Sequence, residues 1–245
     1  MTVLLPDEKI ENLGCGDLGL IQSAKGYRFT TDAVLLANFC KDMTGKTCVE
    51  FCAGSGVISL LVCYKKHPKH IFAVEIQPRL ADMAKRSVEL NGLQNSITVV
   101  NADLNDEPTY LGGKLADVVV CNPPYRKLGS GERQQADELA VCRHELRVNL
   151  AQVVSAASSI LNNKGSFYLV HQSSRLAEIV CECGKNNLAV KEILPVCPRP
   201  GREPNVVLVR AVKCGAADCV LHAPLFVTDS DGNYTPQAKA WYGLD

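Results

Sequence analysis

The chain has 245 residues, of which 47% are hydrophobic and 21% are charged. A chain of this length buries roughly 70–75% of its extended surface on folding, so the composition excludes disordered and fibrous proteins. Its 26 basic residues balance its 26 acidic ones. A polyanionic partner would therefore have to meet a local basic patch.

The chain carries no sign of a membrane span or an export signal. Its longest apolar run, residues 57–64, is far shorter than the roughly 20 residues of a membrane-spanning helix. The first residues lack the basic flank and long apolar stretch of a secretory signal, so we expect a cytoplasmic protein. The 12 cysteines include no Cys-x-x-Cys pair, which predicts reduced thiols and no metal site.

The first 45 residues predict an N-terminal extension that packs on a catalytic domain of residues 46–245. Short strands at 10–13 and 18–22 flank a glycine-rich turn, which is typical of a hairpin. A helix is then expected to begin at Thr30 or Thr31, since either residue can cap it.

From Thr47 onward, short apolar runs alternate with helical patterns, which predicts an α/β fold with parallel strands and crossover helices. An antiparallel hairpin is expected later, at the edge of the sheet. The predicted strands are 47–51, 71–75, 97–100, 117–121, 166–171, 190–195, 205–213 and 219–227, and the predicted helices are 57–65, 79–91, 148–161 and 174–184. A turn at 231–233 is expected to end the structured part.

A glycine-bearing loop, Glu50–Gly56 (EFCAGSG), lies where the first parallel strand ends and a helix begins. Glycines there allow a tight turn and a close approach of a ligand to the free amides of the helix N-terminus. The spacing does not fit a dinucleotide fingerprint, which would need a glycine at Ser59. An ordinary strand-to-helix turn is the alternative interpretation.

Acidic residues follow three consecutive predicted strands. Glu50 belongs to the first strand end, Glu75 to the second and Asp103 to the third. Ligands of open parallel sheets bind beyond these carboxyl ends, where a carboxylate can accept hydrogen bonds from ribose hydroxyls or an adenine amino group. Glu75 alone could be a solvated strand end and Asp103 a turn cap, but the set predicts a nucleoside-containing ligand.

The segment Asn122-Pro123-Pro124-Tyr125 directly follows the fourth predicted strand. Two prolines stop the strand and force an extended turn into the same crevice. The Asn122 side-chain oxygen and the Pro123 carbonyl could then accept both protons of one planar amino group, while Tyr125 offers a ring for stacking. An ordinary Pro-Pro loop is the alternative.

With these residues, the sequence resembles the class I S-adenosylmethionine-dependent methyltransferases, and among them the bacterial tRNA(Val) adenine-N6 methyltransferase family. The blocks that carry the resemblance are Phe29–Ala37 (FTTDAVLLA), Asn122–Lys127 (NPPYRK) and Arg143–Glu145 (RHE). It implies a Rossmann-like fold with a mostly parallel seven-stranded sheet, helices on both faces and an antiparallel edge hairpin. Cys52 departs from the family loop, which often has glycine there, but we expect it to precede the tightest part of the turn.

The resemblance also implies roles for individual residues. The catalytic residues would be Asn122, Pro123, Pro124 and Tyr125, which would hold the target. Thr31 and Asp32 would close the cofactor pocket, or else only cap a helix. The S-adenosylmethionine-binding residues would be Thr31, Asp32, Glu50, Cys52, Ala53, Gly54, Gly56, Glu75, Asp103 and Asn122.

The expected activity is methyl transfer to the exocyclic amino group of adenine in tRNA, at position 37 of the valine tRNA. RNA phosphates need basic residues, and residues 185–213 hold six of them against two acids. Arg199 and Arg202, which flank Pro200-Gly201, and Arg126 and Lys127 after the proline turn are the candidates for RNA binding. A charged, solvated loop is the alternative for these four.

Three other functions are compatible with the motifs. The same proline turn occurs in glutamine-N5 methyltransferases of release factors, which usually carry a helical domain ahead of the catalytic fold. Guanine-N2 methyltransferases of ribosomal RNA generally have phenylalanine in place of Tyr125. The third alternative is a non-catalytic protein that binds RNA or a nucleotide. For the tRNA enzyme we expect a monomer without a metal.

Overall fold

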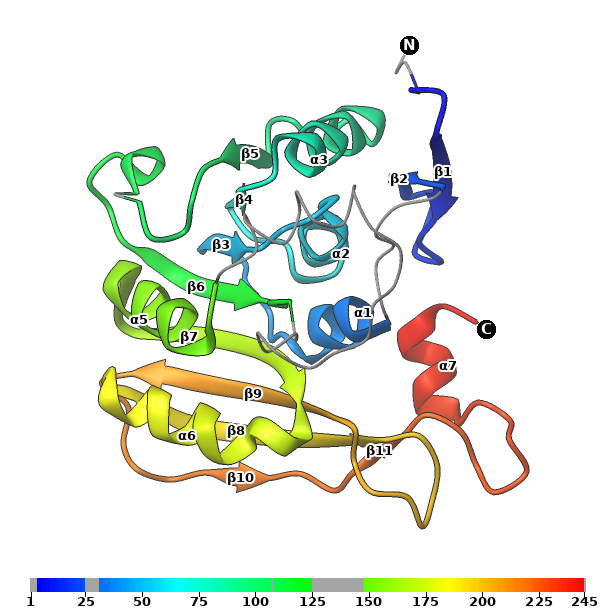
Figure 1. Cartoon of the computed structure of the whole chain (residues 1–245), viewed down its shortest axis with the longest axis vertical. Coiled ribbons are helices and arrows are strands. Elements are labelled where there is room, and N and C mark those ends of the chain that lie inside the picture. Colours follow the sequence, from blue (N-terminus) through cyan, green and yellow to red (C-terminus); the bar gives the residue numbers. More distant parts are fainter. Residues whose placement is uncertain (1–3, 25–30, 107, 125–147, 245) are drawn as a thin grey trace, which may run out of the picture.

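The computed structural model describes residues 4–24, 31–106, 108–124 and 148–244. Its centre is one large sheet, in which seven strands are longer than two residues and two are short (Figure 1). The long strands are β3 (Thr47–Phe51), β4 (His70–Glu75), β5 (Ile97–Asn101), β6 (Ala116–Cys121), β7 (Leu161–Gln172), β8 (Leu188–Cys197) and β9 (Val206–Lys213). The short ones are β10 (Val220–Leu221) and β11 (Leu225–Phe226).

The strand order is β10-β8-β9-β7-β6-β3-β4-β5, and β11 also pairs with β8. Strands β5, β4, β3, β6 and β7 run parallel, whereas β9 is antiparallel to both β7 and β8. Helices alternate with the parallel strands because a parallel connection needs a long crossover. The predicted mostly parallel sheet with an antiparallel hairpin towards one edge is confirmed.

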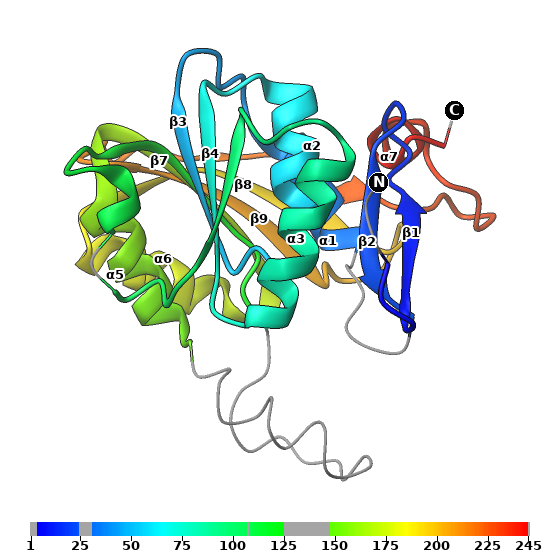
Figure 2. The ribbon, with the colours of Figure 1, turned by 90° about the horizontal axis from the view of Figure 1, so that it is seen from above.

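Helices cover both faces of the sheet (Figure 2). On one face lie α1 (Thr31–Phe39), α2 (Val57–Lys66) and α3 (Pro78–Leu90), and on the other α5 (Leu150–Ile160) and α6 (Leu176–Lys185). Two one-turn 3-10 helices, η1 (Thr109–Leu111) and η2 (Ser173–Arg175), lie in connections. Each face has its own buried apolar cluster. Because the central strands are buried on both sides, their sequences are nearly continuous apolar runs.

The carboxyl ends of the parallel strands all meet at one edge of the sheet. The connection between β8 and β9, residues 198–205, also lies at this edge, since the antiparallel register pairs Gln172 at the end of β7 with Val206 at the start of β9. The loop is tied to β7, because the Ser173 amide donates to the Asn205 carbonyl at 3.1 Å. Residues far apart in the sequence are thus brought to one rim.

The N-terminal hairpin, β1 (Glu8–Asn12) and β2 (Gly19–Ser23), packs against α3. The Ile21 amide donates to Ser87 Oγ at 2.9 Å, and the Asn91 side chain bonds both backbone groups of Gly19. Leu20 is fully buried in the cluster that also holds α1 and α2. The hairpin is therefore joined to the catalytic fold by shared core, and the boundary at residue 45 stays a prediction.

The structure differs from the predicted elements near the C-terminus. The single strand expected at 219–227 is wrong: β10 and β11 are two short strands separated by His222–Pro224. A helix, α7 (Pro236–Tyr242), follows the predicted turn and was not expected from the sequence. Its signal was Thr235 followed by Pro236, a cap and a first-turn proline.

Within the residues that the structure describes, no helix combines the length and apolarity needed to cross a bilayer.

Candidate active site

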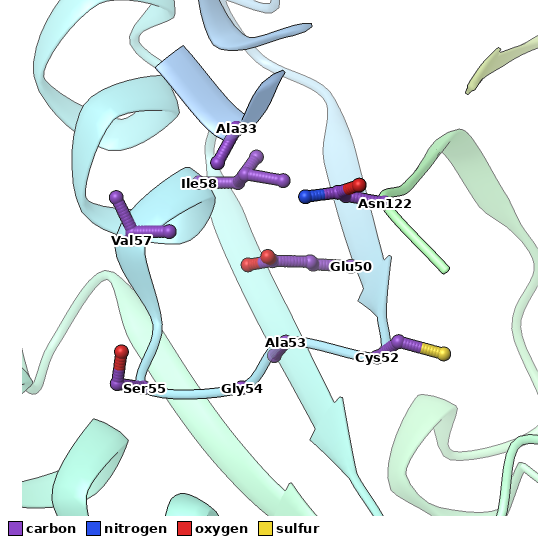
Figure 3. A pocket seen from close by; sticks show the side chains of 9 residues that line it. All are labelled: Ala33, Glu50, Cys52, Ala53, Gly54, Ser55, Val57, Ile58 and Asn122. Carbon is purple, nitrogen blue, oxygen red and sulfur yellow. The ribbon is translucent and has the colours of Figure 1, made fainter. Parts of the chain in front are cut away.

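A pocket opens at the carboxyl edge of the sheet, between the loop after β3, the start of α2 and the end of β6 (Figure 3). It brings together five residues predicted for the site from sequence, which are separated by up to 72 positions. Ala33 of α1 forms part of the wall. The lining residues are Ala33, Glu50, Cys52, Ala53, Gly54, Ser55, Val57, Ile58 and Asn122.

The loop after β3 alternates through left-handed backbone conformations. Cys52 has φ 56°, Gly54 has φ 57° and Gly56 has φ 89°. Cys52 precedes the turn that the Gly56 amide closes on the Ala53 carbonyl at 2.9 Å, as expected, although Cys52 itself also occupies a conformation that favours glycine. Gly56 does not line the pocket; a Cβ there would lie 3.3 Å from the Ala84 Cβ of α3, so it permits close helix packing.

The space around Gly54 is open: apart from its chain neighbours, no described residue has a heavy atom within 4 Å of the position that a Cβ would take. A ligand can therefore approach the backbone closely at this point. The Cys52 sulfur points away from the other lining side chains (Figure 3). Burial raises the pKa of Cys121, and a hydrogen bond with the Cys52 thiol raises it further.

Glu50 is a buried carboxylic group, 1% exposed, that reaches into the pocket (Figure 3). The Ser59 hydroxyl of α2 donates to its Oε2 atom, whereas its Oε1 atom has no hydrogen-bond partner among the residues that the structure describes. Burial raises the pKa of Glu50 to about 8, against the lowering effect of Ser59. An unpartnered buried acceptor is costly, so this atom is suited to a ligand that brings a hydrogen-bond donor, above all a cationic one.

Glu75, at the end of β4, braces the glycine loop. Its Oε2 atom accepts from the Gly54 amide at 2.8 Å and its Oε1 atom from the Gln77 amide at 2.9 Å. The side chain is largely buried, and burial raises its pKa while these backbone bonds oppose the shift. Each carboxylate oxygen has a second lone pair for a further donor.

Asp103 lies beyond β5 and is half-buried. Its Oδ1 atom accepts from both the backbone and the side-chain nitrogen of Asn105, at 2.8 Å in each case. The turn that sequence reasoning gave as the alternative is therefore present. The same turn leaves Oδ2 without a hydrogen bond among the described residues, so turn formation and ligand binding are compatible.

The proline turn begins as predicted. Asn122 directly follows β6, is half-buried, and extends into the same space as Glu50 (Figure 3). Pro123 is buried and Pro124 is exposed. The predicted stacking residue Tyr125 and the predicted RNA contacts Arg126 and Lys127 lie outside the described residues.

Thr31 and Asp32 form the first turn of α1, beside the pocket residue Ala33. Neither lines the pocket in the described structure. Thr31 instead lies near Tyr242 of α7: burial raises the pKa of Tyr242, and the Thr31 side chain opposes this shift. The Asn38 side chain donates to the Trp241 carbonyl at 3.0 Å, so the C-terminal helix holds α1 at both ends.

Sequence reasoning missed residues that support the loop from outside it. Ser59 fixes the Glu50 carboxyl, and Gln22 of β2, 1% exposed, reaches Ser55 at 3.5 Å. A polar residue within the buried strand 19–23 was the available signal for Gln22. Val57 and Ile58, which line the pocket, follow simply from the start of α2.

The structure separates the six basic residues of 185–213 into two groups. Four have partners: Lys185 pairs with Glu182, Lys191 with Asp218 and Arg210 with Glu192, while Lys213 donates to two carbonyls. Arg199 and Arg202 form no ion pair within the described part of the chain. Both lie on the 198–205 loop at the carboxyl edge of the sheet.

Arg199 and Arg202 are the first and last residues of one tight turn. The Arg202 amide donates to the Arg199 carbonyl at 3.2 Å, and Gly201 has φ 76°. A proline in the second position and a left-handed glycine in the third are typical of a type II turn. The turn holds the two guanidinium stems near each other.

No cluster of three or more potential metal ligands occurs among the residues that the structure describes.

The strand order, the glycine loop after the first parallel strand and the acid after the second together define a class I methyltransferase fold. Known structures agree. One is a predicted O-methyltransferase of Agrobacterium tumefaciens, with TM-score 0.69, 24% identity and coverage of 86% of this chain and 95% of that one. Another is TYW2 of P. horikoshii in complex with MeSAdo, with TM-score 0.60, 15% identity and coverage of 86% and 73%.

Residues 21–182 match the family model of the methyltransferase small domain, and the chain belongs to this family. Two curated relatives bear the name tRNA1(Val) (adenine(37)-N6)-methyltransferase. That of Aeromonas hydrophila is 27% identical over 84% of each chain. That of Aliivibrio salmonicida is 26% identical over 57% of this chain and 58% of its own length.

Proposed function

We propose that this chain is an S-adenosylmethionine-dependent methyltransferase that modifies the exocyclic amino group of adenine in tRNA. The observation that carries the proposal is one pocket that Asn122, from the proline turn, lines together with the glycine loop and Glu50, whose Oε1 atom has no hydrogen-bond partner among the described residues. The names of the relatives support adenine 37 of a valine tRNA as the target.

The residues present fit the cofactor. Glu50 Oε1 would accept from the ammonium of its methionine part, and the open space at Gly54 would admit that part against the backbone. Glu75 and Asp103 would accept from the ribose hydroxyls and the adenine amino group. Bound there, S-adenosylmethionine supplies an electrophilic methyl group on a sulfonium.

Asn122 and Pro123 address the difficulty of methylating an aromatic amine, whose lone pair is shared with the ring. If the Asn122 side-chain oxygen and the Pro123 carbonyl accept both amino protons, the lone pair turns towards the methyl carbon. These hydrogen bonds strengthen as positive charge develops on nitrogen. Holding the reactants in this geometry can lower the barrier by up to about 7–11 kcal/mol, so a strong base is not needed for the attack.

Arg199 and Arg202 would bind RNA beside the pocket, with Arg199 meeting a phosphate. Strands β6 and β9 are separated only by β7, so the base of the 198–205 loop lies about 10 Å from the end of β6 at the usual strand spacing. An adenine in an anticodon loop is already unpaired, so turning it into a pocket costs little. Arg126 and Lys127 keep their proposed role as further RNA contacts.

The rival activities fit the described residues less well. Arg199 and Arg202, which pair with no acidic residue of the described chain, favour a polyanionic substrate over a protein. A monomer in the cytoplasm, acting without a metal, completes the proposal.

The test is a transfer assay with isotope-labelled S-adenosylmethionine, offered with unmodified tRNA in one reaction and with release factor in another. We expect N6-methyladenosine in the tRNA. Label on glutamine, on guanine or on neither substrate would contradict the proposal.

Two variants separate the assigned roles. Asn122→Ala should reduce transfer at least about a hundredfold while cofactor affinity, measured by calorimetry, stays near wild type, because it removes an interaction made mainly in the transition state. Glu75→Ala should instead weaken cofactor binding. Equal loss of binding and transfer in Asn122→Ala would refute its catalytic role.

A further inference from the structure

A second cavity, of about 400 Å³, lies in the 198–205 loop. It is lined by Pro198, Gly201, Arg202, Glu203 and Asn205, none of which belongs to the cofactor pocket. All five lining residues are exposed, so it is a hollow of the surface that is open to solvent. The loop lies at the same edge of the sheet as Asn122.

Hydrogen bonds to neighbouring elements hold both rims of this cavity. On one side, the Thr228 amide and hydroxyl donate to the Pro198 carbonyl at 2.9 and 3.0 Å. On the other, Asn205 donates its amide to Val196 and accepts from the Ser173 amide, each at 3.1 Å. The backbone of the cavity is thus formed without a ligand, which reduces the entropic cost of binding.

The side-chain heads in the cavity are not used by the fold. Arg202 and Glu203 form no ion pair with each other or with any other described residue, although they are adjacent in sequence. The Asn205 side-chain amide, like these two, makes no hydrogen bond within the described part of the chain. A guanidinium, a carboxylate and an amide are therefore all presented to solvent around one hollow.

The carboxylate indicates which part of an RNA fits here. A site for phosphate alone would be weakened by Glu203, because like charges repel. A base offers amino and imino donors to a carboxylate, an edge that an amide can pair with, and a face on which a guanidinium can stack. Arg199, on the outer end of the turn, is left to meet the adjoining phosphate.

We propose that this cavity binds the base of a nucleotide near the target adenine, and that Glu203 and Asn205 select a base bearing an amino group. This inference rests on the proposed tRNA activity and adds to it a second point of base recognition. Because only one strand, β7, separates β6 from β9, the base read there lies a few nucleotides from the methylated one. The cavity would thus contribute to the choice of RNA without touching the reacting atoms.

The experiment uses synthetic anticodon stem-loops whose loop nucleotides are changed one at a time to analogues that lack the amino group, such as inosine for guanosine. With the wild-type enzyme, removal of the amino group at one loop position other than the target should lower kcat/KM about tenfold or more. The loss should come from a higher KM, with kcat kept. In Glu203→Gln that penalty should disappear while kcat on the parent stem-loop is kept. Glu89→Gln, an exposed residue near the end of α3 at the opposite edge, is the matched control.

The outcomes distinguish this inference from the proposed function. If wild type methylates no adenine, the proposed function fails. If wild type methylates adenine but Glu203→Gln retains the same discrimination at every loop position, only the base-reading site is refuted. Uniformly tighter binding of all stem-loops by Glu203→Gln would also refute it, because that result marks a phosphate site with a repulsive neighbour.

Discussion

Glu50 is a buried acid whose protonation is coupled to folding. Its pKa in the folded protein is about 8, against an ordinary value of 4.5, because burial disfavours the carboxylate and Glu75 adds repulsion. A raised folded pKa means that the folded state holds a proton that the unfolded state releases. Stability from this residue is therefore unaffected below pH 4.5 and falls as the pH rises towards 8.

Glu50→Gln should remove this loss, since glutamine stays neutral and similar in shape. We expect the free energy of unfolding of the variant to exceed that of wild type at pH 8 by as much as a few kcal/mol, with little difference at pH 5. Urea unfolding at the two pH values measures the effect, with Glu89→Gln as the exposed control. Identical pH dependence in wild type and Glu50→Gln would contradict the assignment.

Cys52 occupies a backbone conformation that costs a non-glycine residue about 1–2 kcal/mol. Cys52→Gly should therefore leave stability unchanged or raise it by up to about 1 kcal/mol, as glycine also loses more entropy on folding. Cys52→Val should lower stability and weaken cofactor binding, because a β-branched residue tolerates this conformation worst. Thermal unfolding and calorimetry test both variants; a stable, tightly binding Cys52→Val would show that the loop relaxes.

Among the connecting segments, the 198–205 loop carries two arginines, Arg199 and Arg202, that form no ion pair with the described residues. Replacing Arg199 and Arg202 together by glutamine should weaken RNA binding and lower the slope of log affinity against log salt by about 0.7 to 1.4, at about 0.7 per phosphate contact of a single strand. The control, Lys185→Gln with Lys191→Gln, removes the same charge from residues that already have acidic partners. Equal slopes for the two double variants would show that the loop is a solvated surface loop that does not bind RNA.

Most elements were predictable because their signals are local. The helices at 57–66 and 78–90 begin directly after a glycine or at a proline and carry apolar residues at helical spacing. The end of the chain was not predictable in the same way. β10 and β11 contain two residues each and exist through pairing with β8, and α7 is short enough to depend on packing against α1.

At the scale of the molecule, the N-terminal hairpin and the methyltransferase domain share one core. Leu20→Ala should lower stability by about 2–5 kcal/mol, and the whole chain should still unfold in a single step. Circular dichroism and the fluorescence of Trp241, which packs against the same cluster, should report one coincident transition. An early transition confined to the hairpin would instead support an independent unit at residues 1–45.

The alternation of strands and helices, the glycine loop, the acids at three strand ends and the proline turn could all be predicted from sequence. These features follow from residues adjacent in the chain, whose backbone preferences and spacing act locally. Three features depend on the folded chain: Glu75 braces Gly54, one oxygen of Glu50 has no partner among the described residues, and Arg199 and Arg202 form no ion pair with them at the catalytic edge. Each of these features depends on contacts between segments that are distant in the sequence. Strand order and antiparallel register bring such segments together, and the local preferences of the residues do not encode them.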